Sequence, residues 1–138
     1  MRRFIGLLVL AIVLAGCSTS QTSEADVLVA KPENLYAYQE KTVENNSTII
    51  VTRDSGLIGV GGAFAFYLNG KLVARLYRQE RAVFYVPSGE FLLGYGSVGG
   101  LVKDGPRIER ETILKAGETK RFRLFIDQDG NMDIRPSS

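Results

Sequence analysis

The stretch Phe64-Ala65-Phe66-Tyr67-Leu68-Asn69-Gly70-Lys71-Leu72-Val73-Ala74-Arg75-Leu76 predicts a β-hairpin. Asn-Gly between two apolar runs favours a two-residue type I′ turn, because both central residues of that turn need positive φ. The flanking runs alternate in the way that half-buried strands do, so we expect strands over residues 63–68 and 71–77. The side chains expected to face the core are Phe64, Phe66 and Leu68 on the first strand and Leu72, Ala74 and Leu76 on the second.

Short runs of β-branched and aromatic residues, separated by turn residues, continue on both sides of this hairpin. They predict further strands over residues 48–52, 81–86, 90–95, 107–115, 119–126 and 132–135. No long amphipathic helical pattern follows position 17, which argues against alternating strands and helices. About seven or eight short strands at this spacing predict an all-β fold, either an antiparallel β-sandwich, which we favour, or a small barrel. Its core is expected to include Phe84, Val86, Phe122 and Leu124 as well.

The first 16 residues have the order of an export signal. Met1-Arg2-Arg3 is cationic, residues 4–14 are apolar throughout, and small residues precede Cys17. The apolar run is too short for a membrane-spanning helix, which needs about 20 residues. We therefore predict three segments: a signal over residues 1–16, a lead-in over residues 17–46, and the sandwich over residues 47–136.

The lead-in is expected to be loosely organised. Ser18-Thr19-Ser20-Gln21-Thr22-Ser23 is small and polar, which predicts a flexible tether. Together with residues 24–34 it would span about 20–25 Å as a coil and lift the domain off a membrane. The apolar run Val27-Leu28-Val29-Ala30 could dock on the domain. Residues 35–44 fit either a short helix or a strand, and we favour a helical turn or an irregular lead-in there.

Leu14-Ala15-Gly16-Cys17 resembles the lipobox of bacterial lipoproteins. The resemblance implies that the Cys17 sulfur receives a diacylglyceryl group, that the chain is cut before it, and that its new amine is acylated, typically with palmitate. Several acyl chains make a stable anchor where a single chain does not. Ser18, a residue other than Asp, implies transfer to the outer membrane of Gram-negative cells, facing the periplasm, with display at the cell surface left open.

Composition removes several classes of function. Without Arg2 and Arg3 the chain has 15 basic and 15 acidic residues, so nothing indicates the concentrated positive face that nucleic acid requires. The chain has no His and only one Cys, which excludes zinc sites and nucleophile–histidine pairs. We expect no metal, no cofactor, no disulfide and no enzymatic activity.

Three segments carry a second resemblance: Ile50-Val51-Thr52-Arg53-Asp54, Phe66-Tyr67-Leu68-Asn69-Gly70-Lys71-Leu72-Val73 and Val86-Pro87-Ser88-Gly89-Glu90. Together they resemble a family of small bacterial outer-membrane lipoproteins of unassigned function. The last two also resemble the PEGA type of β-sandwich domain, found on bacterial surface proteins. The resemblance implies an immunoglobulin-like sandwich and supplies no catalytic residues.

Two glycine-rich apolar segments, residues 56–62 and 94–101, are the candidate contact surface. A plain connector would be polar, so the two segments could either pack on the domain as a crossover or together form one apolar surface for a partner or ligand. The second segment fits G-x-G-x-x-G, but no helix start follows it, which argues against dinucleotide binding. The candidate contact residues are Leu57, Ile58, Val60, Tyr95, Val98 and Leu101.

Two functional hypotheses follow from the sequence. In the first, the chain is a non-catalytic, membrane-anchored lipoprotein that contacts another protein of the cell envelope. In the second, it is a ligand-binding module that holds a lipid, glycan or small molecule near the glycine-rich segments. A closed apolar cavity would favour the second hypothesis, and a flat exposed apolar patch would favour the first.

Overall fold

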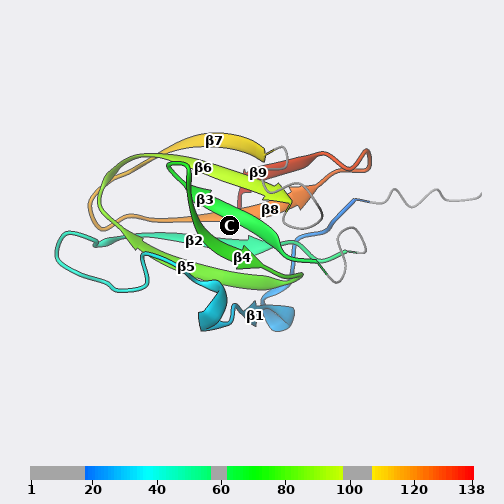
Figure 1. Cartoon of the computed structure of the whole chain (residues 1–138), viewed down its shortest axis with the longest axis horizontal. Coiled ribbons are helices and arrows are strands. Elements are labelled where there is room, and N and C mark those ends of the chain that lie inside the picture. The colour runs from blue at the N-terminus through cyan, green and yellow to red at the C-terminus, as the bar shows by residue number, and fades with distance from the viewer. Residues whose placement is uncertain (1–17, 57–61, 98–106) are drawn as a thin grey trace, which may run out of the picture.

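The computed structural model describes residues 18–56, 62–97 and 107–138, and these form two β-sheets packed face to face (Figure 1). One sheet has the strand order β1-β5-β2-β8-β9 and the other β4-β3-β6-β7. The strands are β1 (Leu28–Val29), β2 (Ser47–Arg53), β3 (Phe64–Leu68), β4 (Lys71–Leu76), β5 (Glu80–Val86), β6 (Gly89–Ser97), β7 (Arg107–Leu114), β8 (Thr119–Ile126) and β9 (Met132–Pro136). Two short 3₁₀ turns, η1 (Glu24–Asp26) and η2 (Pro32–Asn34), are the helical elements of the described residues. The predicted all-β sandwich is therefore confirmed.

The hairpin over residues 64–76 forms as predicted. Asn69 and Gly70 have φ of 49° and 79°, the positive values of a type I′ turn. The second arm differs in one respect, because the register shifts so that Phe66 pairs with Ala74 and Tyr67 with Leu72. Val73 is thus the extra residue of a β-bulge, and it is buried while Leu72 is only half-buried. Strict alternation could not foresee this inserted residue.

Two strand pairs are parallel, whereas the sequence predicted an antiparallel sandwich. β2 pairs in parallel with β8 and antiparallel with β5, and the short β1 pairs in parallel with β5. β7 and β8 follow each other in sequence but belong to different sheets. The turn between them therefore changes sheets, and β8 enters beside β2 running in the same direction.

The core lies between the sheets and is made of the predicted aromatic and aliphatic side chains. Phe66 and Phe84 face each other from opposite sheets with ring centroids 5.6 Å apart, and both are fully buried. Phe64 is half-buried and packs against this core. The other predicted core side chains, Leu68, Val86, Phe122 and Leu124, are also buried.

Two glycines of β6, Gly94 and Gly96, face outward, away from this core. Side chains alternate along the strand, so Tyr95 points inward while Gly94 faces out. The Tyr67 side chain of the neighbouring strand covers Gly94 so closely that a Cβ there would come within 3.0 Å of it. The G-x-G pattern is thus a packing feature of a strand, in agreement with the rejection of dinucleotide binding.

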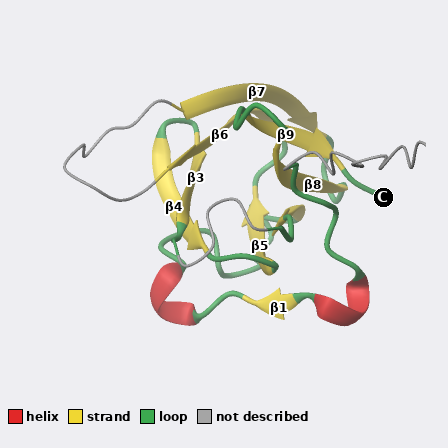
Figure 2. Ribbon diagram, turned by 90° about the vertical axis from the view of Figure 1, so that its right-hand side faces the viewer, coloured by secondary structure: helices red, strands yellow, loops and turns green. Residues whose placement is uncertain are grey.

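Residues 19–38, here called the strap, run along one side of the sandwich, with both 3₁₀ turns and β1 in this segment (Figure 2). Leu28 and Ala30 donate backbone hydrogen bonds to the carbonyls of Gln79 and Arg81, so the docking of this apolar run is confirmed. The Tyr36 amide then donates a hydrogen bond to the Val73 carbonyl of β4, and the Tyr38 carbonyl accepts one from the Tyr85 amide of β5. The strap therefore closes the gap between the two sheets on this side. Residues 35–44 form the expected irregular lead-in.

The opposite side of the sandwich is closed by polar side chains. β7 and β9 are edge strands of different sheets, and Arg110 of β7 forms an ion pair of 2.9 Å with Asp133 of β9. Farther along β7, Lys120 of β8 donates to Thr112 at 3.5 Å. These links connect the two sheets on this side.

Candidate functional site

The described chain begins at a buried polar cluster, here called the clasp, made of Thr19, Asp54 and Arg123. The Thr19 hydroxyl donates to Asp54 at 3.0 Å and accepts from the Ile126 amide at 2.9 Å. The Thr19 amide donates to the Ile126 carbonyl at 2.9 Å. Thr19 is thus held at the ends of β2 and β8. The predicted flexible tether over residues 18–23 is wrong from Thr19 onward, because these bonds fix the chain.

Asp54 is the centre of the clasp. Its side chain is only 1% exposed and pairs with Arg123, whose Nε donates to Oδ1 at 2.9 Å and whose second nitrogen donates to Oδ2. A buried carboxylate is costly unless it is paired and hydrogen-bonded, and Asp54 has both kinds of partner. Two further links extend the clasp, with the Thr22 hydroxyl donating to the Arg53 carbonyl and Ser20 bridging Ser55.

The neighbouring Arg53 points the other way, into the sandwich. It donates to the carbonyls of Gly62 and Leu76 at 2.6 and 2.8 Å, and its guanidinium lies 4.2 Å above the ring of Phe64. Burial lowers the pKa of this guanidinium. The Arg-Asp pair that ends β2 therefore serves both sides of the strand, with Arg53 joining the two sheets and Asp54 holding the N-terminal segment.

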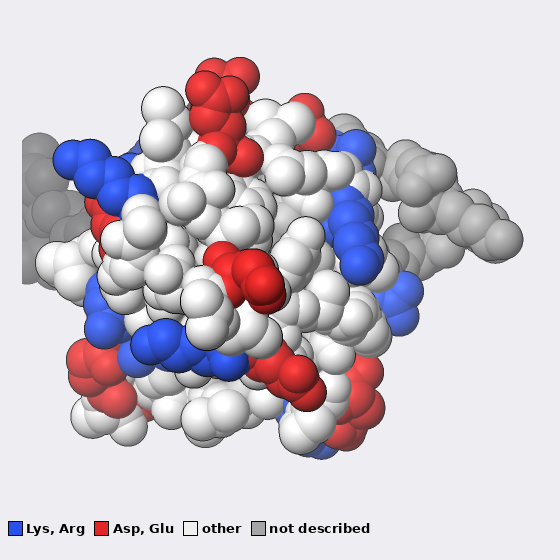
Figure 3. All heavy atoms as spheres, turned by 90° about the vertical axis from the view of Figure 1, so that its left-hand side faces the viewer, with Lys and Arg blue, Asp and Glu red and all other residues white. Residues whose placement is uncertain are grey.

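The clasp defines two ends of the sandwich. The end at which β2 and β8 finish is here called the anchor end, and in Figure 1 the start of the described chain lies there beside the β8–β9 turn. The other end, here called the distal end, carries the turns that follow β5 and β7. Figure 3 looks onto the distal end and shows acidic and basic side chains interspersed on that face.

Of the predicted contact residues, the structure describes Tyr95. Its ring is fully buried against Phe64, with centroids 5.3 Å apart, so it offers no surface to a partner. In the described part of the chain its hydroxyl has no hydrogen-bond partner, and burial raises its pKa. Tyr95 alternates with glycines that face outward, which is why the sequence placed it in an apolar loop. The other predicted contact residues, Leu57, Ile58, Val60, Val98 and Leu101, lie outside the described residues.

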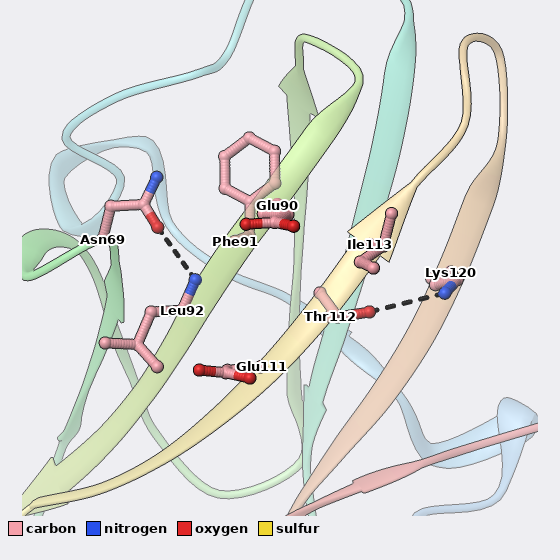
Figure 4. A pocket seen from close by; sticks show the side chains of 8 residues that line it. All are labelled: Asn69, Glu90, Phe91, Leu92, Glu111, Thr112, Ile113 and Lys120. Atoms are coloured by element: carbon pink, nitrogen blue, oxygen red, sulfur yellow. Dashed lines mark hydrogen bonds between the residues drawn. The ribbon is translucent and has the colours of Figure 1, made fainter.

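A hollow of about 680 Å³ lies toward the distal end, on the β6–β7 ribbon (Figure 4). Its lining residues are Asn69, Glu90, Phe91, Leu92, Glu111, Thr112, Ile113 and Lys120. Glu90 pairs across the strands with Ile113, and Leu92 pairs with Glu111, so carboxylates and aliphatic side chains alternate diagonally. The Asn69 side chain accepts from the Leu92 amide at 2.8 Å and fixes one wall.

This hollow is open and of mixed polarity. Glu90, Glu111 and Ile113 are exposed, and Ile113 retains 60% of its accessible surface. An enclosed apolar cavity that would bury a lipid-like ligand requires the opposite character. The sequence did not reveal this hollow because its lining comes from the β3–β4 turn, from β6 and β7 and from β8, which meet only in the folded sheets.

The acidic residues of the β8–β9 region have separate partners. Asp127 accepts from the amides of Asp129 and Asn131, and these bonds lower its pKa. Asp133 pairs with Arg110 and Arg135 instead. Within the described ranges no group of three or more acidic, His or Cys side chains is placed to hold a metal ion.

Comparison with known proteins identifies the N-terminal segment. Residues 1–18 match the profile of a prokaryotic membrane lipoprotein lipid attachment site. The chain is a membrane-anchored lipoprotein. The anchor is the lipid on its cysteine, Cys17, two residues before the clasp. No curated protein matches the lipoprotein in sequence. Over the residues that the structure describes, no helix has the length and apolar character needed to cross a bilayer.

Proposed function

We propose that this lipoprotein is a non-catalytic component of the outer membrane that contacts another envelope protein through the hollow on β6 and β7. Transfer to the outer membrane is supported by Ser18, the residue that follows the lipidated Cys17. The observation that carries the contact is the alternation of Glu90 and Glu111 with Leu92 and Ile113 on an open surface. Such a surface suits a partner segment that presents basic and apolar side chains together, because charge pairing adds specificity to apolar burial.

The second hypothesis, a ligand-binding module, has weaker support from the described residues. Its candidate residues in the glycine-rich segments lie largely outside them, and Tyr95 is buried in the core. The described hollow is half polar and open, which is unlike the largely apolar and enclosing sites of small ligands. A protein partner is therefore the better fit.

The test is in-cell photocrosslinking from Ile113, followed by mass spectrometry of the captured species. We expect one dominant envelope protein, and we expect its capture to be lost in the Glu111→Lys variant, which reverses the charge of the hollow. Glu109→Lys is the matched control, because Glu109 lies on the same strand but pairs with Arg107 at 3.2 Å outside the hollow.

Capture that is equal in the Glu111→Lys and Glu109→Lys variants would refute the role of the hollow. A crosslinker at Leu57 tests the glycine-rich segment in the same cells. An adduct of a lipid or glycan there, with no protein captured at Ile113, would favour the ligand-binding hypothesis instead.

A further inference from the structure

The distance between the lipid and the folded domain is set by the clasp. Cys17 carries the lipid and Thr19 is held at the anchor end, so two peptide units join them. Consecutive Cα atoms are 3.8 Å apart, and the two units therefore span at most about 7.6 Å. The polar headgroup layer on each side of the hydrocarbon core is about 5–8 Å thick. The link is thus about as long as the headgroup layer is deep.

We infer that the anchor end of the sandwich rests directly on the lipid headgroups, with the strands pointing away from the membrane. The inference depends on the lipid at Cys17 and is independent of any protein partner. A free tether would let the domain tumble well clear of the bilayer, whereas the clasp removes that freedom at Thr19.

A second observation supports a lipid surface as the occupant of this end. Leu28 and Val29 of β1 are 55% and 84% exposed, and Tyr77 is 44% exposed. All three lie beside the start of β5, since Leu28 is aligned with Glu80 and Tyr77 is in the turn before it. β5 runs antiparallel to β2, so its start is at the anchor end. Exposed aliphatic side chains and a Tyr are the types that settle into the headgroup region.

Charge at this end is mixed, so the contact requires no particular headgroup charge. The basic residue Arg107 begins β7 there, while Asp127 and Asp129 are in the β8–β9 turn. Vesicles of phosphatidylcholine are therefore a suitable probe.

The experiment places a single fluorescent label at either end of the lipidated, full-length protein. Cys17 is the only cysteine and is acylated, so an introduced thiol is the one that reacts. Gln128→Cys labels the β8–β9 turn at the anchor end, and Ala116→Cys labels the β7–β8 turn at the distal end; both positions are exposed. The eight residues of β8 separate them by about 25 Å.

In phosphatidylcholine vesicles that carry a nitroxide on the headgroup, we expect emission to be lost from the Gln128→Cys label and retained by the Ala116→Cys label. Inserting ten Gly/Ser residues between Ser18 and Thr19 leaves the folded residues unchanged but adds a coil of about 17 Å root-mean-square length. We expect this insertion to restore emission from the Gln128→Cys label.

Equal quenching of the two labels, or stronger quenching at Ala116→Cys, would overturn the inferred orientation. Quenching at Gln128→Cys that is unchanged by the insertion would overturn the role of the short link. The vesicles contain no other protein, so a negative result here is distinguishable from a failure of partner capture in cells.

Discussion

At the residue scale, the position of the domain depends on the side chain of Thr19. This hydroxyl bonds a carboxylate 35 residues away and a backbone group 107 residues away in the sequence. Thr19 and Asp54 are both buried, so water cannot replace the Thr19 hydroxyl as a hydrogen-bond partner of the Asp54 carboxylate. A threonine in a run of small polar residues therefore has a structural role that its neighbours in the sequence do not reveal.

The Thr19→Val variant removes this hydroxyl while preserving the shape of the side chain. Because Asp54 and the Ile126 amide lose a buried partner, we expect the free energy of unfolding to fall by about 1–3 kcal/mol. Urea denaturation of the soluble Cys17→Ser form measures it. Thr119→Val is the matched control, since Thr119 is exposed at the start of β8. A loss in Thr19→Val no larger than that of the control would contradict the clasp.

At the element scale, the strap joins the two sheets through backbone hydrogen bonds and through apolar side chains such as Ala30 and Leu35, which belong to the core or pack against it. One of its attachments is ionic, because Glu24, the first residue of η1, accepts hydrogen bonds from both terminal nitrogens of Arg81 at 2.9 and 2.6 Å. Arg81 also donates to Thr52 of the neighbouring strand, so this ion pair links the strap to both β5 and β2.

Acid is expected to loosen the strap before the sheets. The hydrogen bonds from Arg81 lower the pKa of Glu24 in the folded protein below the ordinary value of 4.5. The contribution to stability is therefore complete above pH 4.5 and is lost as the pH falls through the lower, folded value. Hydrogen exchange should show faster exchange at the Leu28 and Ala30 amides in this range than in β8. If exchange at these two amides has the same pH dependence in the Glu24→Gln variant, the loosening of the strap is not due to Glu24.

At the scale of the whole molecule, the lipid and the clasp together fix the position of the domain. The lipid holds Cys17 in the membrane, and the clasp transmits that position to a sandwich whose hollow lies toward the far end. In this arrangement the hollow on β6 and β7 lies near the end of the sandwich that is farther from the bilayer, where another envelope protein can reach it. The proposed partner contact and the inferred orientation are thus compatible.

The Cys17→Ser variant tests membrane attachment of the whole protein. Because residues 1–18 match a lipid attachment site, the lipid on Cys17 is the expected means of attachment. We expect the variant to leave the membrane fraction after salt and carbonate washes, while Ser18→Ala, which retains the cysteine, stays in it. Cys17→Ser protein that still sediments with membranes after both washes would show a second means of attachment.

The sequence by itself determined the lipid anchor, the strand positions and most of the core. Local patterns predict each of these: the residues before Cys17, the turn at Asn69-Gly70, and the alternation along β3, β5 and β8. Such patterns depend on backbone geometry within a few residues, so they can be interpreted without knowing which strands meet.

Only the tertiary structure decided the parallel pairing of β2 with β8, the bulge at Val73, the burial of Tyr95 and the ordering of the strap from Thr19 onward. The strap shows the reason most clearly. Ser and Thr side chains bond equally well to water or to protein, and composition alone therefore predicted a flexible tether. Its order comes from Asp54 and Ile126, which lie far along the chain and meet Thr19 only when the two sheets are assembled.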